Sequence, residues 1–358
     1  NVGSCARFKK LLLDVFRFLR DVAKDGGGLT AAISQRGGLS RVRCLAARRY
    51  PDVEIDVSIS EIGVAAPRWR YAIGIKQQQR GARSPYLGYE RVWRGSKLIL
   101  NRPDADDLRD EERLTETHLQ SNNTNSGFRE LAKFFDAVFY LHLVPQLVRH
   151  PREFSGPGVA GDPFGRSFLE KIARVPEKTR KSRLKTIEEA LRVAVPQLRE
   201  LTYLIDEKEA GTPHLEAVYE HWRPNGAKQR EGDFSDGTLR LIGLFWSLLE
   251  SDSLLLLEEP ELSLNAGIVS KLPALIHRIQ RKRKRQVLIS THSADLLSDL
   301  GIGAEELLLL TPGAEGTSVQ SAASIAEVRA LLEEGMSIGE AVLPRTAPFD
   351  LSRLGLAV

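Results

Sequence analysis

The spacing of apolar residues changes its period along the chain. In residues 9–24 apolar side chains recur at the intervals of a helix turn, and the glycines of residues 26–28 follow. This pattern predicts an amphipathic helix that ends at the glycines. In residues 53–100 apolar and polar side chains alternate over several short runs, which is typical of an antiparallel sheet with four or more strands. The N-terminal hundred residues are therefore predicted to form a helix and a sheet.

The middle of the chain combines polar and helical stretches. Residues 101–126 are rich in Asp, Glu, Ser and Asn, and this composition indicates an exposed loop or linker. An apolar strand is predicted within residues 139–144. Helices are predicted at residues 168–174 and 181–201, and Pro196 is expected to kink or end the second one.

Aromatic residues and arginines alternate within the predicted sheet. The aromatic residues are Trp69, Tyr71, Tyr86, Tyr89 and Trp93, and the arginines are Arg68, Arg70, Arg80, Arg83 and Arg91. An aromatic face flanked by cations can stack nucleic-acid bases. The favoured interpretation is that the aromatic side chains fill the core and the arginines form a solvated face.

The C-terminal third contains the candidate chemistry. Ser235, Asp236 and Gly237 lead directly into an apolar-periodic helix. A serine hydroxyl and the free backbone N–H groups of a helix start can bind an anion, and an ordinary helix cap is the alternative. The four leucines of residues 254–257 are bounded by two acids, which predicts a buried parallel strand that delivers carboxylates at its C-terminal end.

A second strand is predicted at residues 287–290, after one intervening helix, and it ends just before His292. A lone histidine is usually a surface or core residue. Its expected place at the same edge of the sheet as Glu258 and Glu259 favours a functional role. One acid could hold Mg²⁺, and the other could orient or deprotonate a water molecule.

The segment of residues 3–10 has the length of a phosphate-binding loop. Such a loop reads G-x-x-x-x-G-K-[ST], because glycines let backbone N–H groups surround the phosphates and the hydroxyl holds Mg²⁺. Gly3 and Lys9 fit this pattern, whereas Phe8 replaces the second glycine and Lys10 replaces the hydroxyl.

The composition adds few constraints. The chain is 42% hydrophobic and 27% charged, which is ordinary for a soluble globular protein of two domains, or of one domain with a large insertion. A net charge of +4 is a weak sign of an anionic partner. Two cysteines are too few for a disulfide framework or a metal cage, and no apolar run approaches the roughly 20 residues of a membrane span. A cytoplasmic protein without a membrane partner is expected.

Together the three C-terminal segments resemble the ABC-type ATPases, which carry a signature segment, a Walker B strand, a D-loop and a switch histidine in this order. The resemblance is closest to the soluble branch that includes RecF, the structural-maintenance-of-chromosomes (SMC) proteins and the overcoming-lysogenisation-defect (OLD) nucleases. Within that branch it is closest to bacterial predicted ATPases with the motifs S-D-G-T-L-R and E-E-P-E. The resemblance is strong over residues 232–311. It implies an α/β fold, with a P-loop NTPase core, an antiparallel β subdomain and a helical insertion.

The resemblance implies ATP and Mg²⁺ as cofactors and a role for each matched residue. Glu259 would be the catalytic base, His292 would hydrogen-bond the γ-phosphate, and Glu258 would hold Mg²⁺ where Asp is commoner. The residues that would contact ATP are Gly3, Lys9, Ser235, Asp236, Gly237 and Asn265. Of these, the signature residues 235–237 would reach ATP on the opposite subunit. Residues 263–265 would form the D-loop, with Asn265 where the family more often has Asp.

The resemblance also implies a domain plan. Residues 1–100 would belong to the ATPase lobe, residues 101–230 would form a mostly helical insertion, residues 231–311 would complete the ATPase core, and residues 312–358 would be a tail. The strands that precede the family's phosphate loop are missing here. Since the chain starts at Asn1 and its only methionine is Met336, the N-terminus is expected to be a fragment.

The implied function is an ATP-gated homodimer that acts on DNA or on a partner nuclease or effector, in DNA maintenance, DNA repair or phage defence. The cationic run Arg281, Lys282, Arg283, Lys284 and Arg285 could attract DNA, and a solvated loop is the alternative. A nucleotide-impaired scaffold that keeps the fold is the second hypothesis, based on Phe8 and Lys10. The motor subunit of a transporter is the third and fits the broad insertion less well.

Overall fold

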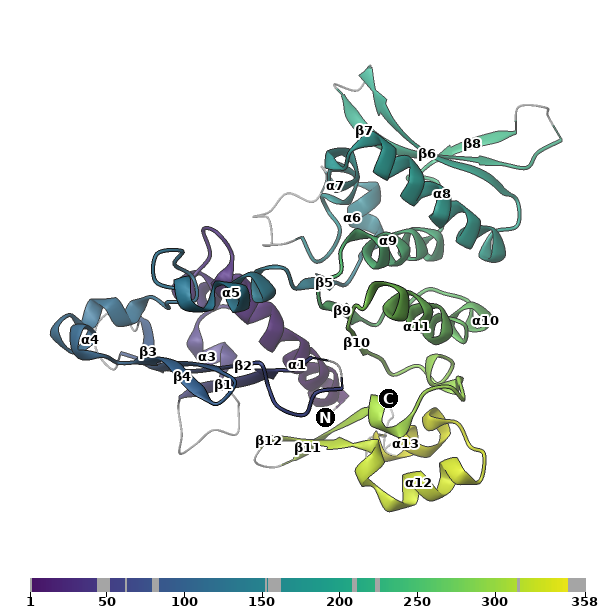
Figure 1. Cartoon of the computed structure of the whole chain (residues 1–358). Helices are drawn as coiled ribbons and strands as arrows, with labels where there is room; N and C mark the ends of the chain where they lie inside the picture. Colours follow the sequence, from purple (N-terminus) through teal and green to yellow (C-terminus); the bar gives the residue numbers. More distant parts are fainter. Residues whose placement is uncertain are drawn as a thin grey trace, which may run out of the picture. The chain divides into compact units, whose positions relative to one another are not determined.

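A computed structural model describes residues 2–43, 52–61, 63–78, 84–151, 153, 162–207, 211–222, 226–313 and 316–346. The chain forms two compact units that mix helices and strands (Figure 1). The first unit comprises residues 1–138 and 310–318, and the second comprises residues 139–309 and 319–358. The predicted α/β fold class is confirmed. None of the helices in the described ranges is long and apolar enough to cross a membrane.

The first unit is built on a four-stranded antiparallel sheet in the order β1-β2-β3-β4. Leu19 and Val22 on α1 are buried in the same core as Tyr71, Ile73 and Ile75 of β2, as the helical and alternating periods require. The predicted helix and sheet are confirmed. The helices are α1 (Val2–Ala23), α2 (Leu29–Ser34), α3 (Leu39–Val42), α4 (Ala105–Arg109), the 3₁₀ turns η1 (Glu111–Thr115) and η2 (Ser126–Phe128), and α5 (Arg129–Asp136); the strands are β1 (Val53–Ile59), β2 (Trp69–Gln77), β3 (Pro85–Arg94) and β4 (Lys97–Arg102).

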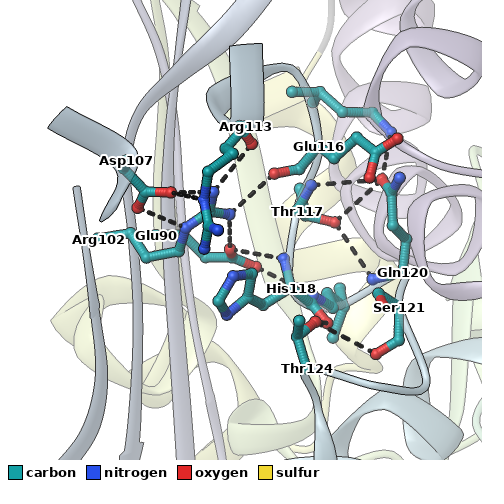
Figure 2. Close-up of polar contacts among 12 residues, drawn as sticks. Glu90, Arg102, Asp107, Arg113, Glu116, Thr117, His118, Gln120, Ser121 and Thr124 are labelled. Atoms are coloured by element: carbon teal, nitrogen blue, oxygen red, sulfur yellow. Dashed lines mark hydrogen bonds and ion pairs between the residues drawn. The ribbon is translucent and has the colours of Figure 1, made fainter. Parts of the chain in front are cut away.

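The polar segment after the sheet is not the loose linker that its composition indicates. Arg102, whose side chain is 1% exposed, pairs with Glu90 at 3.1 Å and with Asp107 at 2.8 Å. It also donates to the backbone oxygens of Arg113 and Glu116 at 2.9 and 2.8 Å. Figure 2 shows these contacts converging on one guanidinium group. The acids of this segment are therefore partners of a buried cation, which a composition count does not reveal.

Glu90 extends the same buried cluster toward the segment that follows. Its carboxylate accepts hydrogen bonds from the Tyr71 hydroxyl at 3.0 Å and from the backbone N–H groups of His118 and Leu119 at 2.8 and 3.2 Å. Hydrogen bonds from Arg102 hold the pKa of Asp107 well below its ordinary value. The charges are fully paired, as buried charges must be.

The aromatic residues of the sheet divide between core and surface. Trp69 and Tyr71 are buried, which confirms the favoured interpretation for these two. Tyr89 and Trp93 are half-buried, and exposed arginines stack on them: the Arg70 guanidinium lies 4.7 Å from the Trp93 ring centre. Arg80 and Arg83 lie outside the described residues.

The second unit contains a parallel sheet in the order β10-β9-β5 and an antiparallel sheet in the order β6-β7-β8. Helix α8 ends before Pro196, as predicted. The sheet β6-β7-β8 lies in residues 198–230, where the sequence predicts mostly helix. The helices are α6 (Pro145–Arg149), α7 (Phe168–Arg174), α8 (Glu177–Ala194), α9 (Asp236–Glu250), α10 (Ala266–Val269), α11 (Leu272–Arg283), α12 (Ala326–Glu333) and α13 (Ile338–Thr346); the strands are β5 (Phe139–Leu141), β6 (Leu198–Asp206), β7 (Thr212–Tyr219), β8 (Ala227–Arg230), β9 (Leu255–Glu258) and β10 (Val287–Ser290). Strands β11 (Leu308–Gly313) and β12 (Gly316–Ser321) form a separate two-stranded sheet, and residues 310–318 of it belong to the first unit.

Candidate functional site

Two parallel strands bring the acids and the histidine loop to one edge of the sheet. Strand β9 is buried through Leu255, Leu256 and Leu257, each 0% exposed, because it lies between β5 and β10. In the register of β9 and β10, Ser290 is opposite Glu258. The residues that follow each strand, Glu259 and the loop with His292, therefore leave the sheet at the same edge, as the sequence predicts.

Strand β5 adds two residues to this edge that sequence reasoning missed. The Tyr140 hydroxyl donates to the Glu258 carboxylate, and Nδ1 of His142 lies 3.1 Å from the backbone oxygen of Glu258. The parallel register of β5 and β9, in which Leu141 is opposite Leu257, produces both contacts. A tyrosine and a histidine at the end of a predicted apolar strand were the available signal. Assigning them required knowing which strands are neighbours.

Glu259 sits at a sharp turn directly after the strand. Its backbone has φ of 44°, in the left-handed region that is uncommon for residues other than glycine. Its N–H still donates to the Ser290 oxygen at 2.9 Å, so the turn begins while the residue remains attached to β10. Ser263 also has a left-handed backbone, with φ of 61°, and Asn265 ends the turn as the N-cap of α10, accepting from the Gly267 N–H at 2.9 Å. The predicted D-loop is a tight, strained turn.

The histidine loop is attached to this turn through Glu261. The Thr291 hydroxyl donates to Glu261, and the Ser293 N–H donates to the Thr291 hydroxyl oxygen at 2.9 Å. Burial raises the pKa of Glu261, while hydrogen bonds from Thr291 and from the backbone N–H of His292 oppose that rise. His292 itself is exposed. Glu261 therefore holds the backbone of the histidine loop, a role that the sequence did not indicate.

The signature segment forms the start of α9. Ser235 is the N-cap, and its hydroxyl oxygen accepts from the Thr238 N–H at 3.1 Å. Gly237 has no side chain for a reason of space: an added Cβ would lie 2.8 Å from the backbone oxygen of Ser263. The predicted signature segment and the turn at Ser263 therefore approach closely, and a side chain at position 237 would press on that turn.

Asp236 has two partners on α6. The Arg149 guanidinium pairs with its carboxylate at 2.6 Å and also donates to the backbone oxygen of Phe234 at 2.5 Å. The side-chain amide of Gln146 donates to Asp236 at 3.3 Å. These contacts span 85 to 90 positions in sequence, so the local motif could not predict them.

Arg240 lies one helix turn after Asp236 and is half-buried. Burial lowers its pKa, while the charges of Asp236, Glu259 and Glu261 act in the opposite direction. A cation on the signature helix is thus within electrostatic range of the acids that follow β9. This arrangement keeps several carboxylates close together at lower electrostatic cost.

The cationic run of residues 281–285 is not a uniformly exposed loop. Arg281, Lys282 and Arg283 form the last turn of α11, and the predicted exposure is wrong for Arg285. This side chain is 2% exposed and donates to the backbone oxygens of Ser247 and Ser253. Burial lowers its pKa to about 10. Arg283 pairs with Asp252 at 3.0 Å. Exposed cations remain at Arg281, Lys282 and Lys284, so the surface available to an anion is smaller than the sequence indicates.

The acids at the sheet edge suit Mg²⁺ that is shared with a nucleotide. No group of three or more His, Cys, Asp or Glu residues in the described part of the chain could hold a metal ion alone. Mg²⁺ usually takes one or two carboxylates and completes its shell with phosphate and water oxygens. Glu258, at the end of β9, can supply one such carboxylate. Gly3 and Lys9 fall within α1, which begins at Val2, so residues 3–10 are helical and the expectation of a phosphate-binding loop there is wrong. Their side chains lie outside the described residues, and their role in binding ATP stays a prediction.

The chain is similar to several solved structures, three of which follow. An SMC ATPase from work on ATP-driven dimerization and DNA-stimulated activation is 13% identical, with 47% of this chain and 94% of that chain covered and a TM-score of 0.33. The SMC head domain from Thermotoga maritima is 10% identical, with 74% and 78% covered and a TM-score of 0.31. An Smc head domain derived from Pyrococcus furiosus, bound to the C-terminal domain of ScpA, is 10% identical, with 75% and 80% covered and a TM-score of 0.33. No curated protein matches the chain.

A protein family gives the decisive match. The family described as "AAA domain, putative AbiEii toxin, Type IV TA system" matches residues 11–299. This range includes β5, β9, β10 and α9, and therefore both acids, the signature and the histidine loop. Because the match spans most of the sequence, the chain belongs to this AAA-domain family of P-loop ATPases.

Proposed function

We propose that the chain is an ATP-hydrolysing protein of ABC type, in the branch that resembles RecF, SMC and OLD proteins. The observation that supports this best is the edge of the parallel sheet. There Glu258 and Glu259 follow β9, while Thr291 and His292 follow the adjacent strand β10. Ligands of open α/β sheets bind at the carboxyl ends of the strands, so these residues stand where a nucleotide would react.

Each residue of this edge has a chemical task in the proposal. Mg²⁺, when bound with ATP, neutralises charge that develops on the phosphate oxygens. Glu258 would hold the ion, and the Tyr140 hydroxyl fixes the orientation of that carboxylate. Glu259 would accept a proton from the attacking water. His292 would hydrogen-bond the γ-phosphate, on a loop that Glu261 holds in place.

The proposed active form is a homodimer. Ser235, Asp236 and Gly237 would contact the γ-phosphate of ATP held by the opposite subunit. Gly3 and Lys9 would contact that ATP from the N-terminal segment, and Asn265 would belong to the D-loop. ATP binding would then close the dimer, and hydrolysis would open it. We propose that this cycle is coupled to DNA or to a partner effector, in DNA maintenance or phage defence, with Arg281, Lys282 and Lys284 as the exposed cations that an anionic partner would meet.

The test is ATP turnover by the purified chain and by Glu259→Gln. Loss of a general base reduces the rate by a factor of roughly 10² to 10⁴, so turnover should fall at least 100-fold while ATP still binds. Glu305→Gln, at an exposed acid of the same unit, is the matched control and should keep full turnover. Equal turnover in Glu259→Gln and the wild type would contradict the assigned role.

The competing hypothesis is a scaffold that keeps the fold without binding nucleotide. Phe8 and Lys10 support it, since neither residue suits a phosphate loop. A chain that folds but neither binds nor hydrolyses ATP would favour the scaffold. Measuring ATP binding directly, by calorimetry with Mg²⁺ present, separates the two hypotheses before any turnover is measured.

A further inference from the structure

The Arg149 side chain contacts the start of α9 at two points. One arm of its guanidinium pairs with Asp236 at 2.6 Å, and the other donates to the Phe234 backbone oxygen at 2.5 Å. The Arg149 side chain is only 16% exposed, whereas that of Asp236 is 36% exposed. Arg149 therefore pairs with the Asp236 charge and also holds the backbone of the turn that carries Ser235.

The helix that carries Arg149 is itself held firmly. Pro145 begins α6, and Val148 is 1% exposed in the core. Leu143, just before α6, packs against Gly243 of α9. A Cβ added to Gly243 would be 2.3 Å from the Leu143 side chain. This close packing fixes α6 against α9 independently of the Arg149 side chain. Truncating that side chain should therefore leave the backbone of α6 in place.

The charge of Asp236 explains why such a cation is needed. Ser235 and the first N–H groups of α9 would face a phosphate in the proposed dimer, and a carboxylate at the first helical position would repel it. A guanidinium 2.6 Å away cancels most of that repulsion and leaves the serine and the backbone N–H groups to meet the anion. Arg149 also restricts rotation of the Asp236 side chain, because the hydrogen bond to the Phe234 backbone oxygen holds the guanidinium in one orientation.

We propose that Arg149 is a positioning residue for the signature segment, and that it acts through Asp236 by neutralising its carboxylate and through Phe234 by fixing the turn. The inference rests on the proposed ATP-dependent dimer. Arg149 itself would not touch the nucleotide. Its loss should therefore weaken the closing of the dimer without preventing each subunit from binding ATP.

A double-mutant cycle tests this proposal in the full chain, with Glu259→Gln present to slow hydrolysis. Dimer formation is measured by analytical ultracentrifugation with saturating ATP and Mg²⁺. Arg149→Met, which keeps an unbranched apolar stem but removes the guanidinium, should raise the dimer dissociation constant about tenfold, the size of a partly screened charge effect. In an Asp236→Asn background the same substitution should raise it less than threefold, because the charge that Arg149 neutralises is gone.

Two controls exclude a purely structural effect. Arg174→Met, at an exposed arginine of the same unit, should change the dissociation constant less than twofold. Arg149→Lys keeps the charge but not the planar fork, so it should fall between the wild type and Arg149→Met; it also serves if Arg149→Met does not fold, which urea unfolding will show. ATP affinity of the monomer should be the same in all variants.

The possible outcomes are distinct. An equal loss in the Asp236 and Asp236→Asn backgrounds would overturn the proposal, since Arg149 would then not act by neutralising the Asp236 carboxylate. A dissociation constant that does not respond to Arg149→Met would also overturn it. A parent protein that binds ATP yet never dimerises would instead overturn the proposed dimer, and the inference would fall with it.

Discussion

Arg285→Met tests whether a cation in a charged run serves the fold. The wild-type guanidinium donates to the backbone oxygens of Ser247 and Ser253 and lies 3.4 Å from the Ser251 hydroxyl. Its removal leaves two carbonyl groups at the end of α9 without that donor. Each lost hydrogen bond to a charged group is worth about 1.5–3 kcal/mol, and removing a buried guanidinium returns part of this because its desolvation also ends. We expect a loss of about 2–3 kcal/mol in the free energy of unfolding.

Arg281→Met is the matched control, because it makes the same change four positions away at an exposed side chain. Exposed substitutions usually change stability by less than about 0.5 kcal/mol. The assay is urea unfolding followed by circular dichroism, with equal slopes required for both variants. If the two variants have equal midpoints, Arg285 does not stabilise the fold and its buried position has been assigned wrongly.

The same pair separates the fold from DNA binding: if the run binds DNA, Arg281→Met should reduce the salt slope of binding by about one, whereas Arg285→Met should leave it unchanged. Gly237→Ala should cost about 1–2 kcal/mol of stability, because its Cβ would press on the Ser263 oxygen, whereas Gly232→Ala, where nothing lies within 4 Å, should cost less than about 0.5 kcal/mol; equal urea midpoints would contradict the close contact. Hydrogen bonds from Arg102 lower the pKa of Asp107, so its contribution is complete above about pH 5 and is lost as pH falls below about 4 towards the folded-state pKa. Asp107→Asn should therefore cost about 3–5 kcal/mol at pH 7 and flatten the loss of stability between pH 5 and pH 3; an unchanged acid slope would contradict this assignment.

The sequence predicted the elements whose pattern is local. Leu255, Leu256 and Leu257 form a buried strand, because a continuous apolar run is suited to a place between two other strands. The apolar period after Gly237 likewise gives a buried helix. What a local pattern cannot show is which segments meet: Tyr140 contacts Glu258 across 118 positions. Similarly, Arg281 and Arg285 count equally as cations in the sequence. Only the structure shows that Arg285 is buried against the end of α9 while Arg281 is exposed.

Arginine, rather than cationic charge in general, explains how several acceptors are held together at Arg102 and at Arg149. Arg102 pairs with two carboxylates and two backbone oxygens, while Arg149 pairs with one carboxylate and one backbone oxygen. Several acceptors in fixed directions match the planar fork of a guanidinium, which has five donors, whereas an ammonium group is a single point of charge. A lysine at either position would keep the charge but present its three donors from a single nitrogen, which does not match the separate directions of these acceptors. Replacement by lysine therefore measures geometry, and replacement by methionine measures geometry and charge together, which is why both are needed to assign the role of Arg149.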